Sequence, residues 1–273
     1  MLRPEKTISH KRMQIFFHEK ARLGHPMFAP ESLICEKLPG DSSNNTSTPC
    51  MPYLTEINED YIEFPRVVYG VKGVMMFMLS FLAIINSVIF FLMIKEGVLF
   101  HYGFLAIILI LSVFYLLPLT IRYVYFTPHV LPVRFNRDKQ KIYFYERKVN
   151  MNPYSRWPVT INVMDWENVQ AFHVTEKVYK GLPYRGLHFV SILRGTEYIM
   201  GHTVLYIVGT PWSLKKRMTY INYIESIWCF CQRYMEFRID SMGYLSPPSP
   251  WFLANKWLIK WPDEFDKASR SVD

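Results

Sequence analysis

The sequence predicts an α+β membrane protein, in which a two-helix transmembrane hairpin precedes an antiparallel β-rich domain closed by a C-terminal amphipathic helix. Two observations lead to this fold class. The apolar residues of the 273-residue chain are concentrated in residues 74–120, although the mean hydropathy of the whole chain is only +0.04. After residue 124 the pattern changes to short alternating runs, followed by one long stretch with a helical period.

The apolar region divides into two blocks that each have the length of a transmembrane helix. Residues 74–94 carry no charged side chain. At 1.5 Å per residue they cover about 31 Å, which matches a hydrocarbon core of about 30 Å. Residues 98–120 form the second span. Lys95, Glu96 and Gly97 lie between the spans and are predicted to form the hairpin tip, with Gly97 as a left-handed cap, because a lysine at the bilayer centre costs about 2.5–3.5 kcal/mol.

Small and polar residues in the first span indicate how the two helices pack. One helical face carries the small residues Ser80, Ala83 and Ser87. Small residues at such spacing allow a second helix to approach closely. Asn86 is the only strongly polar residue of this span, and we expect it to form an interhelical hydrogen bond with Ser112 or Tyr115. The hairpin is therefore predicted to be an anchor rather than a pore.

The distribution of basic residues predicts the orientation of this hairpin. Lys95 is the only basic residue at the tip, whereas basic residues close to the outer ends of the spans are Arg66, Lys72, Arg122, Arg134 and Arg137. The positive-inside rule then places both termini in the cytoplasm. The expected location is the bacterial inner membrane, as a multi-pass protein with the lipid bilayer as one partner.

The region after the hairpin is predicted to be a β-rich domain. Residues 132–147 alternate as a strand–turn–strand with the turn at 137–140, and residues 158–174, 186–193 and 197–208 add further strand-like runs. A long amphipathic helix follows, with apolar residues at Leu214, Met218, Ile221, Ile224, Trp228, Cys231 and Met235. Pleckstrin-homology-like domains share this order, which is an analogy of fold and assigns no function.

These patterns divide the chain into four regions. Residues 1–64 are a polar N-terminal arm with a flexible linker, and residues 65–124 contain the hairpin. Residues 125–240 form the β-rich cytoplasmic domain with its helix. Residues 241–273 are a tail rich in proline and tryptophan.

The basic charge of the protein lies in its C-terminal part. Residues 98–273 hold 21 of the 31 lysines and arginines and 13 of the 23 acidic residues, which accounts for the whole net charge of +8. Such charge favours an anionic membrane surface, and without a recognition motif we do not expect nucleic-acid binding. Candidate contacts with the membrane surface or a partner are Lys215, Lys216, Arg217, Trp251, Trp257 and Trp261. The alternative for the tryptophans is a packed strap.

The sequence gives no positive sign of catalysis. It lacks GxSxG, HExxH and a Walker loop. His173, His188 and His202 lie in predicted strands, but without a carboxylate at ligand spacing they do not predict a metal site. Cys229 and Cys231 do not form a CxxC pair, and helix packing is their expected role. We therefore expect a protein that is not an enzyme and has no catalytic residues, cofactor or metal.

Four segments together resemble an uncharacterised gammaproteobacterial family, domain of unknown function 6708. They are NEDYIEF before the hairpin, VRFNRDKQKIYFYE after it, MDWENVQAF in a predicted strand and IESIWCFCQRYMEF in the last helix. The resemblance covers roughly residues 55–240 and implies an integral membrane domain. It also implies an association with polymorphic toxins or type VI secretion effectors, and carries over no functional residues.

Three functions remain open at this point. The first is a non-enzymatic inner-membrane protein whose cytoplasmic domain binds a partner protein, as the immunity partner of an antibacterial toxin. The second is a lipid-binding or scaffolding module that uses the basic charge and the tail tryptophans. The third is a membrane-tethered enzyme, which no motif supports.

Overall fold

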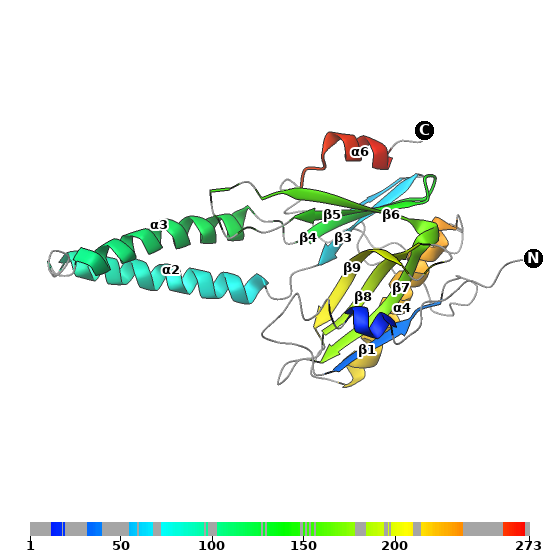
Figure 1. Cartoon of the computed structure of the whole chain (residues 1–273), viewed down its shortest axis with the longest axis horizontal. Coiled ribbons are helices and arrows are strands. Elements are labelled where there is room, and N and C mark those ends of the chain that lie inside the picture. Colours follow the sequence, from blue (N-terminus) through cyan, green and yellow to red (C-terminus); the bar gives the residue numbers. More distant parts are fainter. Residues whose placement is uncertain are drawn as a thin grey trace, which may run out of the picture.

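A computed structural model of the chain shows two antiparallel β-sheets, a long helical hairpin and further helices that include a short one near the N-terminus (Figure 1). The fold is α+β. The residues described are 12–17, 19, 32–39, 55–58, 60–67, 72–95, 97, 103–126, 128, 130–147, 150, 152, 154–155, 157–177, 184–193, 196, 198–209, 214–236 and 259–270.

The larger sheet has five strands in the order β2-β3-β4-β5-β6. Its strands are β2 (Glu56–Ile57), β3 (Tyr61–Val67), β4 (Val130–Asn136), β5 (Lys141–Arg147) and β6 (Val159–Asp165). The turn between β4 and β5 covers residues 137–140, as the sequence predicted. Asn136 Oδ1 accepts a hydrogen bond from the backbone N–H of Lys139 at 2.7 Å, and Gln140 adopts a positive φ of 52°.

The smaller sheet has four strands in the order β1-β7-β8-β9. They are β1 (Ser32–Lys37), β7 (Val169–Lys177), β8 (Tyr184–Ile192) and β9 (Ile199–Gly209). A 3-10 turn at Trp166–Asn168 links β6 of one sheet to β7 of the other. The N-terminal arm supplies β1, β2 and the start of β3, strands that the sequence analysis did not predict.

The main core lies where the two sheets and helix α4 (Leu214–Met235) meet. Phe135 and Phe144 of the larger sheet pack at ring-centroid distances of 6.2 Å against Phe189 of the smaller sheet. Trp228 of α4 packs on Phe189 at 5.2 Å. Helix α4 closes this core with the C-terminal part of the predicted apolar face, because Ile224, Trp228, Cys231 and Met235 are buried. The side chains of Leu214, Met218 and Ile221, which complete that face, lie outside the described part of the chain.

Helices α2 (Lys72–Lys95) and α3 (Gly103–Tyr125) form a hairpin that extends away from both sheets (Figure 1). Gly97 has a φ of 66°, and its N–H donates to the carbonyl of Ile94 at 3.2 Å. The chain therefore leaves α2 through a left-handed glycine, the conformation that a side chain disfavours.

The predicted transmembrane hairpin is not supported. Among the helices that the structure describes, none is both long enough and apolar enough to cross a membrane. The prediction of spans at 74–94 and 98–120 is therefore wrong, and so is the predicted multi-pass location in the inner membrane with both termini cytoplasmic. The predicted second span, residues 98–120, also differs from the helix in its bounds, since α3 begins at Gly103 and continues to Tyr125.

The charges used for orientation also lie elsewhere than expected. Arg66 and Arg134, which were placed at the cytoplasmic membrane surface, are 1% exposed in the β-rich part of the fold. Arg66 Nη1 donates to Glu146 Oε1 at 2.8 Å, and its Nη2 donates to the carbonyl of Tyr145 at 2.9 Å. The orientation prediction counted lysines and arginines along the sequence. Such a count does not distinguish buried, ion-paired arginines from charges at the surface.

Candidate functional site

Among the hairpin side chains that the structure describes, most of the large apolar ones are exposed. The two helices contact each other, and Ser112 Oγ of α3 donates to Asn86 Oδ1 of α2 at 3.1 Å, which confirms the predicted interhelical hydrogen bond. Five phenylalanines are between 52% and 78% exposed: Phe77, Phe81, Phe91, Phe104 and Phe114. We define these five residues as the hairpin surface. Exposed apolar patches of this kind usually mark an interaction site.

The small residues of α2 lie partly within the hairpin. Ala83 is 5% exposed, and Ser80 and Asn86 are half-buried. Ser87 is exposed, and its hydroxyl donates to the carbonyl of Ala83 within the same helix at 2.8 Å. At the tip, Lys95 ends α2 and is exposed, Gly97 forms the turn, and Glu96 lies outside the described residues.

A hollow lies where the hairpin meets the sheets. It has a volume of 460 Å³ and is lined by Leu117, Pro118, Ile121, Arg122, Phe126 and Arg147. The guanidinium of Arg122 stacks on the ring of Trp157 at 4.8 Å, and the hydroxyl of Tyr154 donates to the carbonyl of Phe114 at 2.6 Å. The base of α3 is therefore held to the loop that precedes β6.

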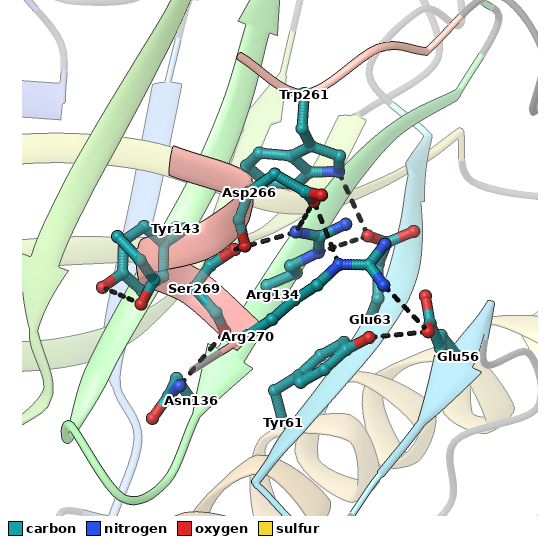
Figure 2. Close-up of polar contacts among 11 residues, drawn as sticks. Glu56, Tyr61, Glu63, Arg134, Asn136, Tyr143, Trp261, Asp266, Ser269 and Arg270 are labelled. Atoms are coloured by element: carbon teal, nitrogen blue, oxygen red, sulfur yellow. Dashed lines mark hydrogen bonds and ion pairs between the residues drawn. The ribbon is translucent and has the colours of Figure 1, made fainter. Parts of the chain in front are cut away.

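A buried polar cluster fixes the C-terminal helix α6 (Asp263–Arg270) to the larger sheet (Figure 2). Arg134 of β4 is at its centre: Nε donates to Glu63 Oε2 at 2.6 Å, and Nη1 donates to Asp266 Oδ1 at 2.6 Å and to Ser269 Oγ at 2.8 Å. The Trp261 ring covers the guanidinium at 4.2 Å, and its Nε1 donates to Glu63 Oε2 at 3.2 Å.

Neighbouring residues extend this cluster on both sides. Asn136 Nδ2 donates to the carbonyl of Ser269 at 3.1 Å, and the hydroxyl of Tyr61 donates to Glu56 Oε1 at 2.6 Å. Burial and the Glu56 carboxylate raise the pKa of Tyr61 to about 12. Burial raises the pKa of Asp266, but the hydrogen bonds and charges of Arg134 and Arg270 outweigh it and hold that pKa below its usual value.

The charged side chains of the cluster around Arg134 form ion pairs with one another. The Arg134 guanidinium already donates to two carboxylates and a hydroxyl, so these donors are committed to the α6 contact. The cluster therefore serves to attach α6 rather than to receive a ligand. Trp261 is 7% exposed, which corresponds to the packed strap and not to a membrane or partner contact.

A second polar feature lies on the outer face of the smaller sheet. His188 Nδ1 and His202 Nε2 are 2.9 Å apart, and their rings stack at 5.1 Å. The ring of Phe17, from the helical segment 12–17, contacts both imidazoles edge-on at 5.2 and 5.4 Å. Burial, His202 and then His173 lower the pKa of His188 well below its usual value. The two imidazole rings therefore form a packing surface for the N-terminal segment 12–17.

The other residues weighed for chemistry are part of the packing. Among the described residues, no group of three or more histidine, cysteine or acidic residues could hold a metal ion. Cys229 and Cys231 are buried in α4, and burial raises the pKa of both thiols. Cys35 is also buried, which raises its pKa to about 12. Thiols with raised pKa values are poor nucleophiles at neutral pH.

The remaining predicted contact residues cannot be placed in a site. Lys215, Lys216 and Arg217 lie in the first turn of α4, but their side chains are outside the described part of the chain. Trp251 and Trp257 also lie outside the described residues. Sequence reasoning missed Arg134, Glu63 and Asp266, because they are up to 203 positions apart and no local pattern joins them.

The fold and its sites define an α+β protein with an attached apolar helical hairpin. Residues 107–257 match the family of unknown function DUF6708, so the chain belongs to this family. The match overlaps most of the region, 55–240, on which the resemblance was recognised. No curated protein and no solved structure matches the chain.

Proposed function

We propose that this chain is a non-enzymatic binding protein that holds a protein partner through the hairpin surface. The observation that carries this proposal is the exposure of the five phenylalanines on α2 and α3. With about 200 Å² for each phenylalanine, their exposed fractions correspond to roughly 650 Å² of surface. A specific interface buries about 800 Å² on each partner, and the three phenylalanines of α2, which lie on the helix face opposite Asn86, supply roughly 370 Å² of that area on one side of the hairpin.

The chemistry of the hairpin indicates what kind of partner fits it. Between Lys72 and Lys95, and again between Gly103 and Ile121, the helices carry no charged side chain. A charged partner surface would lose its hydration there without gaining an ion pair. A helix or helix pair with an apolar face fits best, because its ridges can pack into the grooves of α2 and α3.

A finer proposal is that this partner is an antibacterial toxin and that the chain is its immunity protein. The support is the resemblance to a family associated with such toxins. An immunity protein acts by binding and needs no catalytic group. The proposal predicts that expression of this chain protects a cell against the toxin encoded beside its gene.

The experiment compares protection by three versions of the full chain. The wild type is expected to restore growth of cells that produce the neighbouring toxin. The double variant Phe81→Gln/Phe91→Gln should lose protection, because it places two amides on the hairpin surface. The matched control Tyr198→Gln changes a side chain that is 67% exposed just before β9 and should protect fully. Unchanged killing with the wild type would refute the immunity role.

The role of the hairpin is tested separately from the immunity role. Purified toxin and chain are mixed, and the complex is measured by analytical ultracentrifugation for each version. If Phe81→Gln/Phe91→Gln binds the toxin as tightly as the wild type, the hairpin surface is not the binding site. Circular dichroism of each variant establishes that it is folded.

A further inference from the structure

Strand β6 forms one edge of the five-stranded sheet and is paired only on its β5 side among the strand pairings that the structure describes. All seven of its residues are in register with β5, and no bulge interrupts the ladder. Edge strands expose a row of backbone N–H and C=O groups, which can pair with a further strand. We propose that β6 pairs antiparallel with β6 of a second copy of this chain and joins the two larger sheets into one.

The other edge strands carry features that oppose such pairing. Strand β2 has only two residues, and β1 carries the exposed charges of Glu36 and Lys37 near its end. The register of β9 with β8 shifts at two places, and Arg66 Nη1 donates to the β9 carbonyl of Val204 at 3.1 Å. Short length, charge and irregular register are the known protections of sheet edges.

The first six residues of strand β6 lack these protections. Its residues 159–164 read VTINVM and contain no charge and no proline. Valine, isoleucine and threonine favour the extended conformation. Thr160, Asn162 and Val163 are exposed, and Val163 presents 42% of its surface. Apart from Asp165 at its last position, the edge is therefore uncharged, uninterrupted by a bulge and accessible within the described part of the fold.

The sequence of β6 is compatible with its own copy. A two-fold axis at the central residue, Asn162, places Ile161 opposite Val163 of the second copy, which joins two β-branched side chains. Asp165 lies opposite Val159 of the second copy and not opposite another aspartate. The two Asp165 residues are six residues apart along the strand direction, or about 20 Å, which exceeds the Debye length at physiological salt.

Charge on the neighbouring strand supports the same register. Arg147 of β5 is paired with Val159 and is therefore on the same face. Asp165 of the second copy would lie one strand further on, about 10 Å from Arg147 between backbones, and the long arginine side chain can bring its guanidinium closer than the Debye length of about 8 Å. The two-fold axis creates this favourable charge relationship twice. An unrelated extended peptide would have to provide such an acidic residue by its own sequence.

The register makes a precise crosslinking prediction. In Asn162→Cys, the two cysteines face each other across the axis with Cα atoms about 4.5–5.5 Å apart, which suits a disulfide. In Thr160→Cys, the two cysteines are four residues out of register, about 14 Å apart, and cannot join. Under mild oxidation, the full-length Asn162→Cys chain is expected to give a disulfide-linked dimer on a non-reducing gel. Wild type and Thr160→Cys should not.

Further variants separate the edge from other contacts between copies. Val163→Lys, introduced into Asn162→Cys, places a lysine opposite Ile161 of the second copy. The two lysines of the dimer would also lie close to each other across the axis and repel, so the linked dimer should be abolished. Tyr198→Lys, also in Asn162→Cys, adds the same charge away from β6 and should leave the dimer in place. Absence of the linked dimer in Asn162→Cys, or equal linkage in Thr160→Cys, would overturn the proposal. If Asn162→Cys does not fold, analytical ultracentrifugation of the wild type and of Val163→Lys decides the question. The wild type should be a dimer and Val163→Lys a monomer, and the same state for both would overturn the proposal.

Discussion

Arg134 and Asp266 are joined by a hydrogen-bonded ion pair of 2.6 Å although 132 positions separate them in the sequence. The pair connects β4, in the middle of the larger sheet, to α6 near the C-terminus. Arg134 also binds Glu63 of β3, so one guanidinium holds three elements together (Figure 2).

Replacement of Arg134 should destabilise the fold strongly. Arg134→Leu leaves Glu63, whose side chain is 5% exposed, without its cation. Breaking a buried ion pair in this way costs about 3–5 kcal/mol of the unfolding free energy. Urea unfolding of the full chain measures the change. Arg270→Gln is the control: the Arg270 side chain is 45% exposed, so its ion pairs should contribute less than about 1 kcal/mol. Equal losses for the two variants would contradict this account.

The histidine pair should make stability depend on pH. The pKa of His188 is lowered in the folded protein by burial, His202 and His173, whereas in the unfolded chain it returns to about 6.5. Below that pH the unfolded chain binds more protons, so stability is present above pH 6.5 and is lost as the pH falls. The loss reaches at most about 1.4 kcal/mol per pH unit.

Urea unfolding at pH 7.5 and at pH 5.5 tests the histidine prediction. His188→Gln keeps a hydrogen-bonding side chain but does not titrate, and should therefore show a smaller loss between the two values. The other titratable groups near the pair are His173 and Glu36, which lie 3.6 Å apart and are unchanged in the variant. The same pH dependence in both proteins would show that His188 is not its source.

The hydrogen bond between Asn86 and Ser112 should couple the two hairpin helices. Removal of either partner by Asn86→Ala or Ser112→Ala should lower thermal stability, and the double variant should lose less than the sum. The expected coupling is about 0.5–1.5 kcal/mol. Ser87→Ala is the matched control, because that hydroxyl donates within its own helix. A double-mutant cycle with zero coupling would refute the interhelical role.

Gly97 should be required because of its left-handed backbone conformation, and not because a larger side chain would collide with neighbouring atoms. No atom lies within 4 Å of a Cβ built at this position, yet the φ of 66° is unfavourable for a side chain. Gly97→Ala should cost about 1–2 kcal/mol, and Gly97→Asn should cost less because asparagine tolerates this region. Thermal unfolding of both variants tests the order. If alanine were as stable as glycine, the left-handed turn would not persist in solution.

Local patterns in the sequence were sufficient for several elements. The alternation of residues 132–147 and the turn at 137–140 gave β4 and β5, and the three- and four-residue spacing gave the buried face of α4. The glycine turn was also predicted, as was an interhelical hydrogen bond from Asn86 to Ser112 or Tyr115, of which the structure shows the one to Ser112. These features depend on interactions within a few turns or between adjacent segments.

The apolar run 74–120 was overinterpreted, since its length and composition suggested a transmembrane hairpin that the described structure does not support. The family match extends only to residues 107–257 and gives no function. The placement of β1 and β2 was missed because their short, mixed sequences carry little periodic signal.

What the sequence alone determined is therefore the local structure of β4, β5, β8, β9 and α4 and the position of the hairpin turn, because side-chain period and backbone preference act over short distances, whereas the single run expected at 158–174 is divided between β6 and β7 of different sheets. Only the tertiary structure decided that Arg66 and Arg134 are buried ion-pair centres, that His188 and His202 meet, and that β6 is an edge strand among the described strands. Those relationships join residues far apart in the chain, and no period or composition records which strands become neighbours.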